Sequence, residues 1–251
     1  MRPLALSLVA FGCICGGVVL GTRLHFRLTD EHRNSDTKEA VRLGMALVGT
    51  MVALVLGLLI GSSKSFYDTQ NSEVTEAAAS VVLLDRVLVH YGPEAREVRV
   101  LLRDSIAVMV EGAGPRDGQK KSHFDPSAVS GERLFDKIQE LSPQNDNQRL
   151  LQTQALGLAI KLGQTRWLMF EQKSSSVPMP LLAMLVFWLT LLFTSFGLFV
   201  RPNVMLVCSL LVSALAVSGA IFLILEMYQP YGGLIHVSDA PLLAALAQLG
   251  Q

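Results

Sequence analysis

The chain has 251 residues, of which 51% are hydrophobic, and its mean hydropathy is positive, well above the usual value for a soluble globular domain. With 21 basic and 21 acidic residues the formal net charge is zero, so no whole-molecule field attracts nucleic acid, which is excluded as a partner. The hydrophobic residues gather in blocks near both ends and the charges in the middle, a distribution that predicts an integral membrane protein.

Four apolar stretches are long enough to cross a bilayer as helices, since a helix needs roughly 20 residues to span about 30 Å of hydrocarbon. None contains a charged side chain between its ends, where a charge would cost at least ~2.5 kcal/mol. The stretches are 3–22, 43–61, 180–200 and 204–225. A secretory signal peptide is the alternative for the first, but no convincing small-x-small cleavage site follows it, so we expect it to remain as a span.

Small residues recur at four-residue spacing within the spans, a pattern that lets helix backbones approach closely in lipid. The pairs are Gly12 and Gly16, Gly17 and Gly21, Gly57 and Gly61, and Ser209 and Ser213. We interpret them as support for tight hairpins, although glycine is also generally commoner in membrane helices. The three cysteines lie inside the apolar blocks, where we expect them to pack as small residues and not to form disulfides: Cys13, Cys15 and Cys208.

The region between the second and third spans predicts a helical insert. Span two continues as a helix to Gly92-Pro93, with an apolar stripe that another helix must cover: Val74, Ala77, Val81, Leu84, Leu88 and Tyr91. A second helix is expected from Glu94 to Gly112, and residues 112–126 should form an exposed loop. A short helix ending near Pro143 and a long one through 151–169 complete three or four helices packed side by side.

The tail begins with a sharp turn and ends in a short helix. Ser238-Asp239-Ala240-Pro241 is typical of a capped helix start, and the apolar residues that follow predict docking on the insert. The predicted fold is therefore all-α, with four transmembrane helices in two hairpins. Its expected parts are a first hairpin (1–61), the insert (62–179), a second hairpin (180–226) and a C-terminal turn and helix (227–251).

The polar regions show no constellation of catalytic or metal-binding residues. They contain no glycine-rich phosphate loop, no zinc spacing and no nucleophile arrangement, so we expect neither an enzyme nor a cofactor. The five histidines lack the short repeats that metal ligation needs, and solvated or structural roles are the simpler interpretation: His25, His32, His90, His123 and His236.

Glu226 stands out because it ends span four directly after apolar residues. An acid at that depth either reaches to the interface or serves an ion path or a buried pair. Lys64, one turn past the end of span two on the same side of the membrane, is its natural partner. Such a pair would join the two hairpins at the membrane surface.

Charge bias does not decide the orientation in the membrane. The two short turns on one side carry six basic residues, namely Arg23, Arg27, Arg33, Lys38, Arg42 and Arg201. The side of the insert and termini carries five near the spans, namely Arg2, Lys64, Lys161, Arg166 and Lys173.

The residues after the last span resemble the exit motif of bestrophins, an acid followed by polar-Pro-aromatic-Gly. Here the motif consists of Glu226 and then Gln229, Pro230, Tyr231 and Gly232. More closely, the chain is similar to a bacterial group called bestrophin-like, whose function is unassigned. The similar stretches are Glu31-His32-Arg33, Leu84-Asp85-Arg86, His90-Tyr91-Gly92-Pro93-Glu94-Ala95, Leu141-Ser142-Pro143, Gln164-Thr165-Arg166-Trp167 and 229–234.

The resemblance implies a homo-oligomer, a pentamer, that forms an anion channel in the inner membrane with the insert and both termini in the cytoplasm. Animal bestrophins carry a calcium-binding acidic run after the exit motif, whereas Gly233-Leu234-Ile235 follows here, so we infer no calcium gate. If Tyr67 matches the tyrosine that follows span two in bestrophins, the pore-lining face is Ala53, Gly57 and Gly61. These residues are small where bestrophins have bulky constrictions.

Two function hypotheses follow. In the first, the chain is an oligomeric ion channel with span two lining the pore. In the second, it is a membrane-anchored scaffold or signalling protein that acts through its helical insert and conducts nothing. A secondary transporter ranks third, because no span has an interruption or an acid at mid-membrane. The sequence does not identify the ion.

Overall fold

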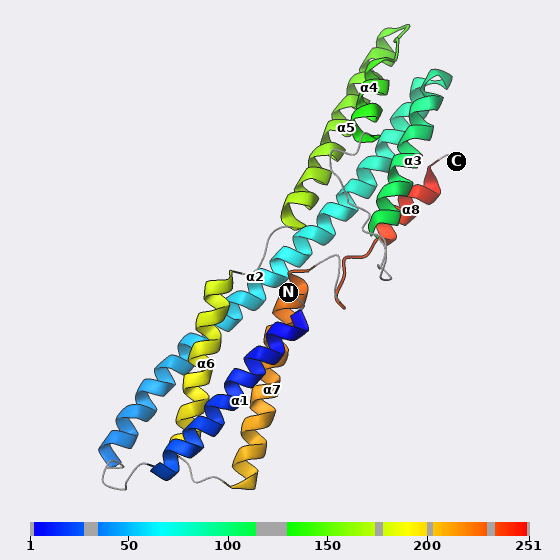
Figure 1. The fold of residues 1–251 in the computed structure, drawn as a ribbon. Helices are drawn as coiled ribbons and strands as arrows, with labels where there is room; N and C mark the ends of the chain where they lie inside the picture. The colour runs from blue at the N-terminus through cyan, green and yellow to red at the C-terminus, as the bar shows by residue number, and fades with distance from the viewer. Residues whose placement is uncertain are drawn as a thin grey trace. The chain divides into compact units, whose positions relative to one another are not determined.

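The computed structural model describes residues 3–27, 35–113, 130–173, 178–199, 203–229 and 234–249, and all regular structure in these ranges is helical (Figure 1). The elements are α1 (Pro3–Arg27), α2 (Ser35–Tyr91), the 3-10 turn η2 (Pro93–Ala95), α3 (Arg96–Ala113), α4 (Ser130–Gln139), α5 (Asp146–Lys173), α6 (Met179–Phe199), α7 (Val204–Met227) and α8 (Ala240–Gln248). By length and composition α1, α2, α6 and α7 could each cross a membrane, which confirms the predicted class.

The chain forms two compact units. One, the membrane unit, contains Met1–Phe66 and Ser176–Tyr228, and the other, the insert unit, contains Tyr67–Ser175 and Gln229–Gln251. Helix α2 contributes residues to both units. The tail therefore belongs to the same unit as the insert, although the whole second pair of spans separates the two in the sequence.

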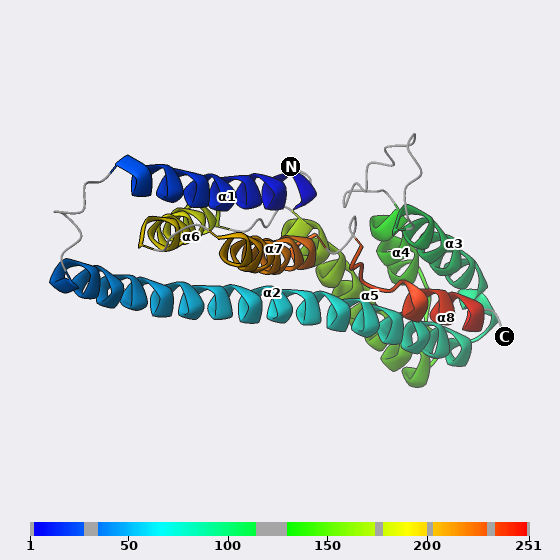
Figure 2. The same cartoon turned by 90° about the horizontal axis from the view of Figure 1, so that it is seen from below.

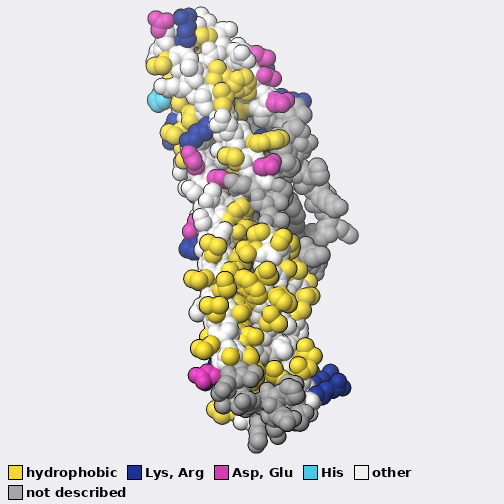
Figure 3. All heavy atoms as spheres, turned by 90° about the vertical axis from the view of Figure 1, so that its left-hand side faces the viewer, with side chains coloured by type: hydrophobic (Ala, Val, Ile, Leu, Met, Phe, Trp, Pro, Cys, Tyr) yellow, Lys and Arg dark blue, Asp and Glu magenta, His cyan; other side chains and the backbone are white. Residues whose placement is uncertain are grey.

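In the membrane unit, α1 packs along α6 and α7. Figure 2 shows α6 and α7 lying between α1 and α2, so the two helices of the first hairpin are not direct neighbours. Helix α2 joins the same core through Val52 and Leu59, alongside Ile14 and Leu185. Hydrophobic side chains dominate the face of this unit shown in Figure 3, as a surface in contact with lipid requires.

Glycines set the contact between α1 and α6. A Cβ atom on Gly17 would lie 2.8 Å from the carbonyl oxygen of Thr190, and one on Gly21 would overlap the carbonyl oxygen of Thr194. From the other side, a Cβ on Gly197 would lie 2.7 Å from the carbonyl oxygen of Val18. The predicted close packing is therefore right for the pair Gly17 and Gly21. It joins α1 to α6, however, and these helices belong to different hairpins.

The other small pairs do not serve packing within the protomer, so that expectation is wrong for them. A Cβ on Gly12, Gly16, Gly57 or Gly61 would meet no atom within 4 Å. Ser209 and Ser213 are exposed on α7. Spacing alone does not determine which face of a membrane helix meets a neighbour.

The insert unit has a core of helix faces. The predicted stripe of α2 from Val74 to Tyr91 is buried in full, which confirms it. It packs with Val98, Leu102, Ile106 and Met109 of α3, Leu134 and Ile138 of α4, and Ala155, Leu162 and Met169 of α5. Most of the predicted loop 112–126 lies outside the described residues, although α3 extends to Ala113.

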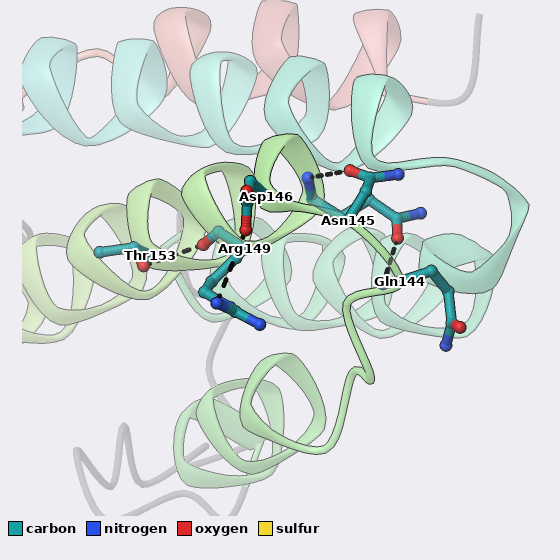
Figure 4. Close-up of polar contacts among 6 residues, drawn as sticks. Gln144, Asn145, Asp146, Arg149 and Thr153 are labelled. Carbon is teal, nitrogen blue, oxygen red and sulfur yellow. Dashed lines mark hydrogen bonds and ion pairs between the residues drawn. The ribbon is translucent and has the colours of Figure 1, made fainter.

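Local hydrogen bonds fix where the insert helices begin. Gly92 has φ +124°, a conformation that suits glycine, and the turn η2 that follows delays α3 to Arg96, two residues later than expected. At α5, Asn145 Oδ1 accepts a hydrogen bond from the Gln148 amide at 2.8 Å (Figure 4). The Gln148 side chain accepts in turn from the Gln144 amide at 2.7 Å. The first bond satisfies a backbone amide that the first turn of a helix leaves unpaired, and the second ties that turn to the residue before the cap.

The tail docks as predicted, because α8 packs on α3 and buries Leu242 and Ala245. The predicted helix start is present, since α8 begins at Ala240, but the side chain of Asp239 at the N-cap position makes no capping hydrogen bond. Its backbone is helical (φ −80°, ψ −2°) and not extended, so the carboxylate is not presented to the first turn. Ser238 Oγ accepts from the Ala240 amide instead, at 3.2 Å.

Candidate functional site

Helix α2 is the least covered of the four spans. Only 11% of its most apolar stretch is buried within the protomer, compared with 33% for α1, 39% for α6 and 28% for α7. A helix that its own chain leaves uncovered faces lipid, other subunits or a water path. The exposed surface of α2 is therefore the candidate functional surface.

Two stripes of different character run along this exposed surface. The first carries large side chains spaced three or four residues apart, each between 49% and 73% exposed: Leu43, Leu47, Met51, Leu54 and Leu58. The second carries Ala53, Gly57 and Gly61, all exposed, with no atom within 4 Å of a Cβ built on either glycine. At 3.6 residues per turn the two stripes are adjacent on the helix. The three residues that the sequence predicted for a pore therefore form one open, small-residue face.

A second feature is the junction between α2 and the end of α7. Ser62 Oγ and Tyr228 Oη lie 3.1 Å apart, and the rings of Phe66 and Tyr228 stack with centroids 5.2 Å apart. Ser63 Oγ donates to the Met227 sulfur at 3.9 Å. These contacts attach the exit of the last span to the helix that carries the small-residue face.

Glu226 lies in this junction and is only 3% exposed, whereas Lys64 is exposed. Of the two roles that the sequence left open for Glu226, reaching into solvent does not fit this burial. Both residues take part in interactions, and so does Gln229. The pairing of Lys64 with Glu226 stays a prediction. The remaining residues of the exit motif, Pro230, Tyr231 and Gly232, lie outside the described residues.

Sequence reasoning missed Phe66 and Tyr228. Both aromatic rings follow the apolar part of a span by only a few residues, and Tyr and Trp often mark that position at the interface. That signal was present at Tyr228, two residues after the acid already singled out. The pairing of the two rings was not, because it depends on how α2 and α7 pack.

Of the predicted histidines, His25 makes a local contact. His25 Nδ1 lies 2.8 Å from the carbonyl oxygen of Leu198, near the last turn of α6. His32 and His123 lie outside the described residues, and among the residues that are described no group of three or more His, Cys, Asp or Glu could hold a metal. The three cysteines are free.

An apolar groove of about 680 Å³ follows α1 and α6 in the membrane unit. Leu6, Val9 and Phe187 are among its lining residues. The Thr190 hydroxyl in the wall of the groove donates to the carbonyl oxygen of Val186 at 2.8 Å. This hydroxyl is therefore satisfied without a polar ligand. The lining of the groove matches the hydrocarbon of a bilayer.

Comparison with known proteins decides the family. A model of the Bestrophin-like domain matches residues 12–242, nearly the whole chain. The chain belongs to the bestrophin-like family. Its fold is similar to that of a mutant bacterial bestrophin homologue from Klebsiella pneumoniae solved by crystallography. The TM-score is 0.67 at 13% identity, over 98% of this chain and 97% of the other. No curated protein gives a significant match.

Proposed function

We propose that this bestrophin-like protein assembles into a ring of identical subunits, a pentamer as the family resemblance implies, in which the α2 helices surround a path for ions. The observation that carries the proposal is the open face of Ala53, Gly57 and Gly61 on the span that its own protomer covers least. Four spans of one chain leave this face without a partner, and a ring would bring five copies of it together around an axis. The leucine stripe beside it would meet lipid or the neighbouring subunit.

Small side chains suit such a path for a physical reason. They leave room for water next to the helix, whereas bulky apolar side chains would narrow the path and favour dewetting. Lys64 follows Gly61 by three residues and so extends the same face at one mouth. A ring of lysines there would raise the local concentration of anions, which supports the anion preference that the resemblance implies. We place the insert and both termini in the cytoplasm, at the inner membrane of a bacterium.

Cysteine modification tests the pore face. In a background in which Cys13, Cys15 and Cys208 are replaced by serine or alanine, Ala53→Cys is compared with its neighbour Leu54→Cys at the same depth. A charged methanethiosulfonate reagent should reduce ion flux from liposomes by about fivefold or more in the first variant and hardly at all in the second, because only a residue in a water path reacts and obstructs it. Equal effects at both positions would contradict the assignment.

The assembly is tested by the mass of the purified protein in detergent. A pentamer with ion flux supports the channel and contradicts the scaffold, whereas a single-protomer mass contradicts the ring. Assembly without flux would favour the scaffold that acts through the insert.

Lys64→Gln should lower the ratio of chloride to cation permeability, measured from reversal potentials. Unchanged assembly and flux in Glu226→Gln would remove that residue from the site.

A further inference from the structure

The insert unit contains a cavity of about 400 Å³ that the channel proposal does not use. It lies between α3, α4 and α5, the helices that pack against one another in this unit. Its volume is within the range of about 300 to 1,000 Å³ that is usual for small-molecule pockets. The side chains around it differ in character from one wall to another.

One wall is apolar. Leu102 and Ile106 of α3, Leu134 of α4 and Leu162 of α5 line it, and each of these side chains is at least 94% buried. Such a surface favours hydrocarbon, because water next to it gains no hydrogen bonds from the protein. A ligand of this cavity therefore needs an apolar segment.

Another part of the lining carries a cation. Arg166 of α5 reaches across to the first turn of α4, where a Cβ on Gly131 would lie only 2.8 Å from its Nη1 atom. Burial lowers the pKa of the Arg166 guanidinium. A positive charge that is partly withdrawn from water is stabilised by a nearby anion, and the amino end of α4 adds its own partial positive charge.

Two carboxylates limit the charge of that anion. Glu132 and Asp136 of α4 also line the cavity, and both are exposed to solvent. They would repel a head group with two charges more than one with a single charge. The cavity thus combines an apolar wall, one partly buried cation and two solvated acids.

From this arrangement we propose that the cavity binds an amphipathic monoanion, a medium-chain carboxylate whose head group lies at Arg166 and whose chain lies along Leu102, Ile106 and Leu162. The site belongs to the insert unit alone. The proposal therefore does not depend on whether the membrane unit conducts ions.

Trp167 lines the same cavity and is a built-in reporter. The chain has two tryptophans, and replacing Trp188 of α6 with phenylalanine leaves Trp167 as the only one. This protein, in nanodiscs of neutral lipid, is titrated with octanoate and with octanol, which has the same chain length and no charge. Octanoate should change the fluorescence of Trp167 saturably and bind more tightly than octanol. Partition into the lipid gives a change that does not saturate.

Arg166→Met should weaken octanoate binding at least about tenfold, the loss expected for one charge-assisted hydrogen bond, and change octanol binding less than about twofold. The matched control is Arg133→Met, since Arg133 is exposed on α4 and does not line the cavity. Ala159→Leu, which fills the cavity from α5, should abolish binding of both ligands. The circular dichroism of each variant checks that it is folded.

Three results would overturn the proposal. The first is a linear response to octanoate in the parent protein, and the second is equal affinity in Arg166→Met and Arg133→Met. The third is tighter binding of octyl phosphate, which carries roughly two charges near neutral pH, because the two acids should disfavour it.

Discussion

Asp85 shows how a single residue can differ from its sequence pattern. It lies off the apolar stripe of α2, which predicts an exposed carboxylate, but it is 5% exposed. Arg99 Nε and Nη2 of α3 donate to its two oxygens at 2.7 and 3.1 Å. This bidentate pair raises the pKa of Arg99 and joins the two helices on either side of the Gly92 turn. A buried carboxylate is tolerated here because its charge is matched.

Removing one partner of this pair should be costly, because it leaves the other charge poorly solvated. Asp85→Ala should lower the free energy of unfolding of the insert unit by about 3 kcal/mol, the lower end of the usual range, since Arg99 keeps some contact with water. Glu97→Ala removes one of the two carboxylates that pair with the half-exposed Lys137, the other being Glu140, and should leave stability nearly unchanged. Urea unfolding followed by Trp167 fluorescence in the Trp188→Phe protein measures both. Equal destabilisation in the two variants would contradict the buried-pair account.

At the scale of elements, the contact between α1 and α6 depends on the absence of side chains. Lipid gives no hydrophobic drive for helices to associate, so close backbone contact supplies the attraction. Gly21 and Gly197 allow that contact, whereas Gly12 and Gly16 on the same α1 helix meet nothing. One helix thus offers both a test position and its control.

Gly21→Ala should separate α1 from α6, since the added carbon would overlap the backbone of Thr194. We expect a loss of about 1 to 3 kcal/mol, the usual cost of overpacking, seen as a lower midpoint when the protein is unfolded from mild detergent by SDS. Gly12→Ala, which adds the same carbon in open space, should not lower the midpoint. A larger effect at Gly12 would mean that this glycine packs against another subunit.

At the scale of the whole molecule, the insert unit is assembled from two separate parts of the chain. Helix α8 completes the core of the unit. Tyr67, the first residue of the unit, donates a hydrogen bond from its Oη to the carbonyl oxygen of His236 in the tail at 3.3 Å. The unit can therefore reach its full stability only after the last two spans have been made. Its C-terminal residues are part of its core.

Leu242→Ala should weaken the packing of α8 on the insert unit, whereas Leu243→Ala should not. Leu242 is 2% exposed and Leu243 is 50% exposed, so the two neighbours differ in burial but not in chemistry. Truncating Leu242 should cost about 2 kcal/mol or more and speed amide hydrogen exchange in α3, on which α8 packs. If exchange in α3 is equal in both variants, α8 does not stabilise the unit.

The sequence by itself determined which solvent each segment meets. The length and charge-free character of the four spans identified them, and periodic burial identified the stripe from Val74 to Tyr91, because hydrophobicity and helix period are local properties. It also placed the small residues Ala53, Gly57 and Gly61 on one face of span two, although which surface they serve could not be read from spacing.

Only the tertiary structure decided which faces meet. In the structure Gly17 and Gly21 contact α6, and Glu226 is buried near the end of α7. Asp85 pairs with Arg99, and Arg166 lies against Gly131 at the edge of a cavity. These contacts join residues far apart in the chain, and their free energies depend on fitting two surfaces together. No window of sequence contains that information.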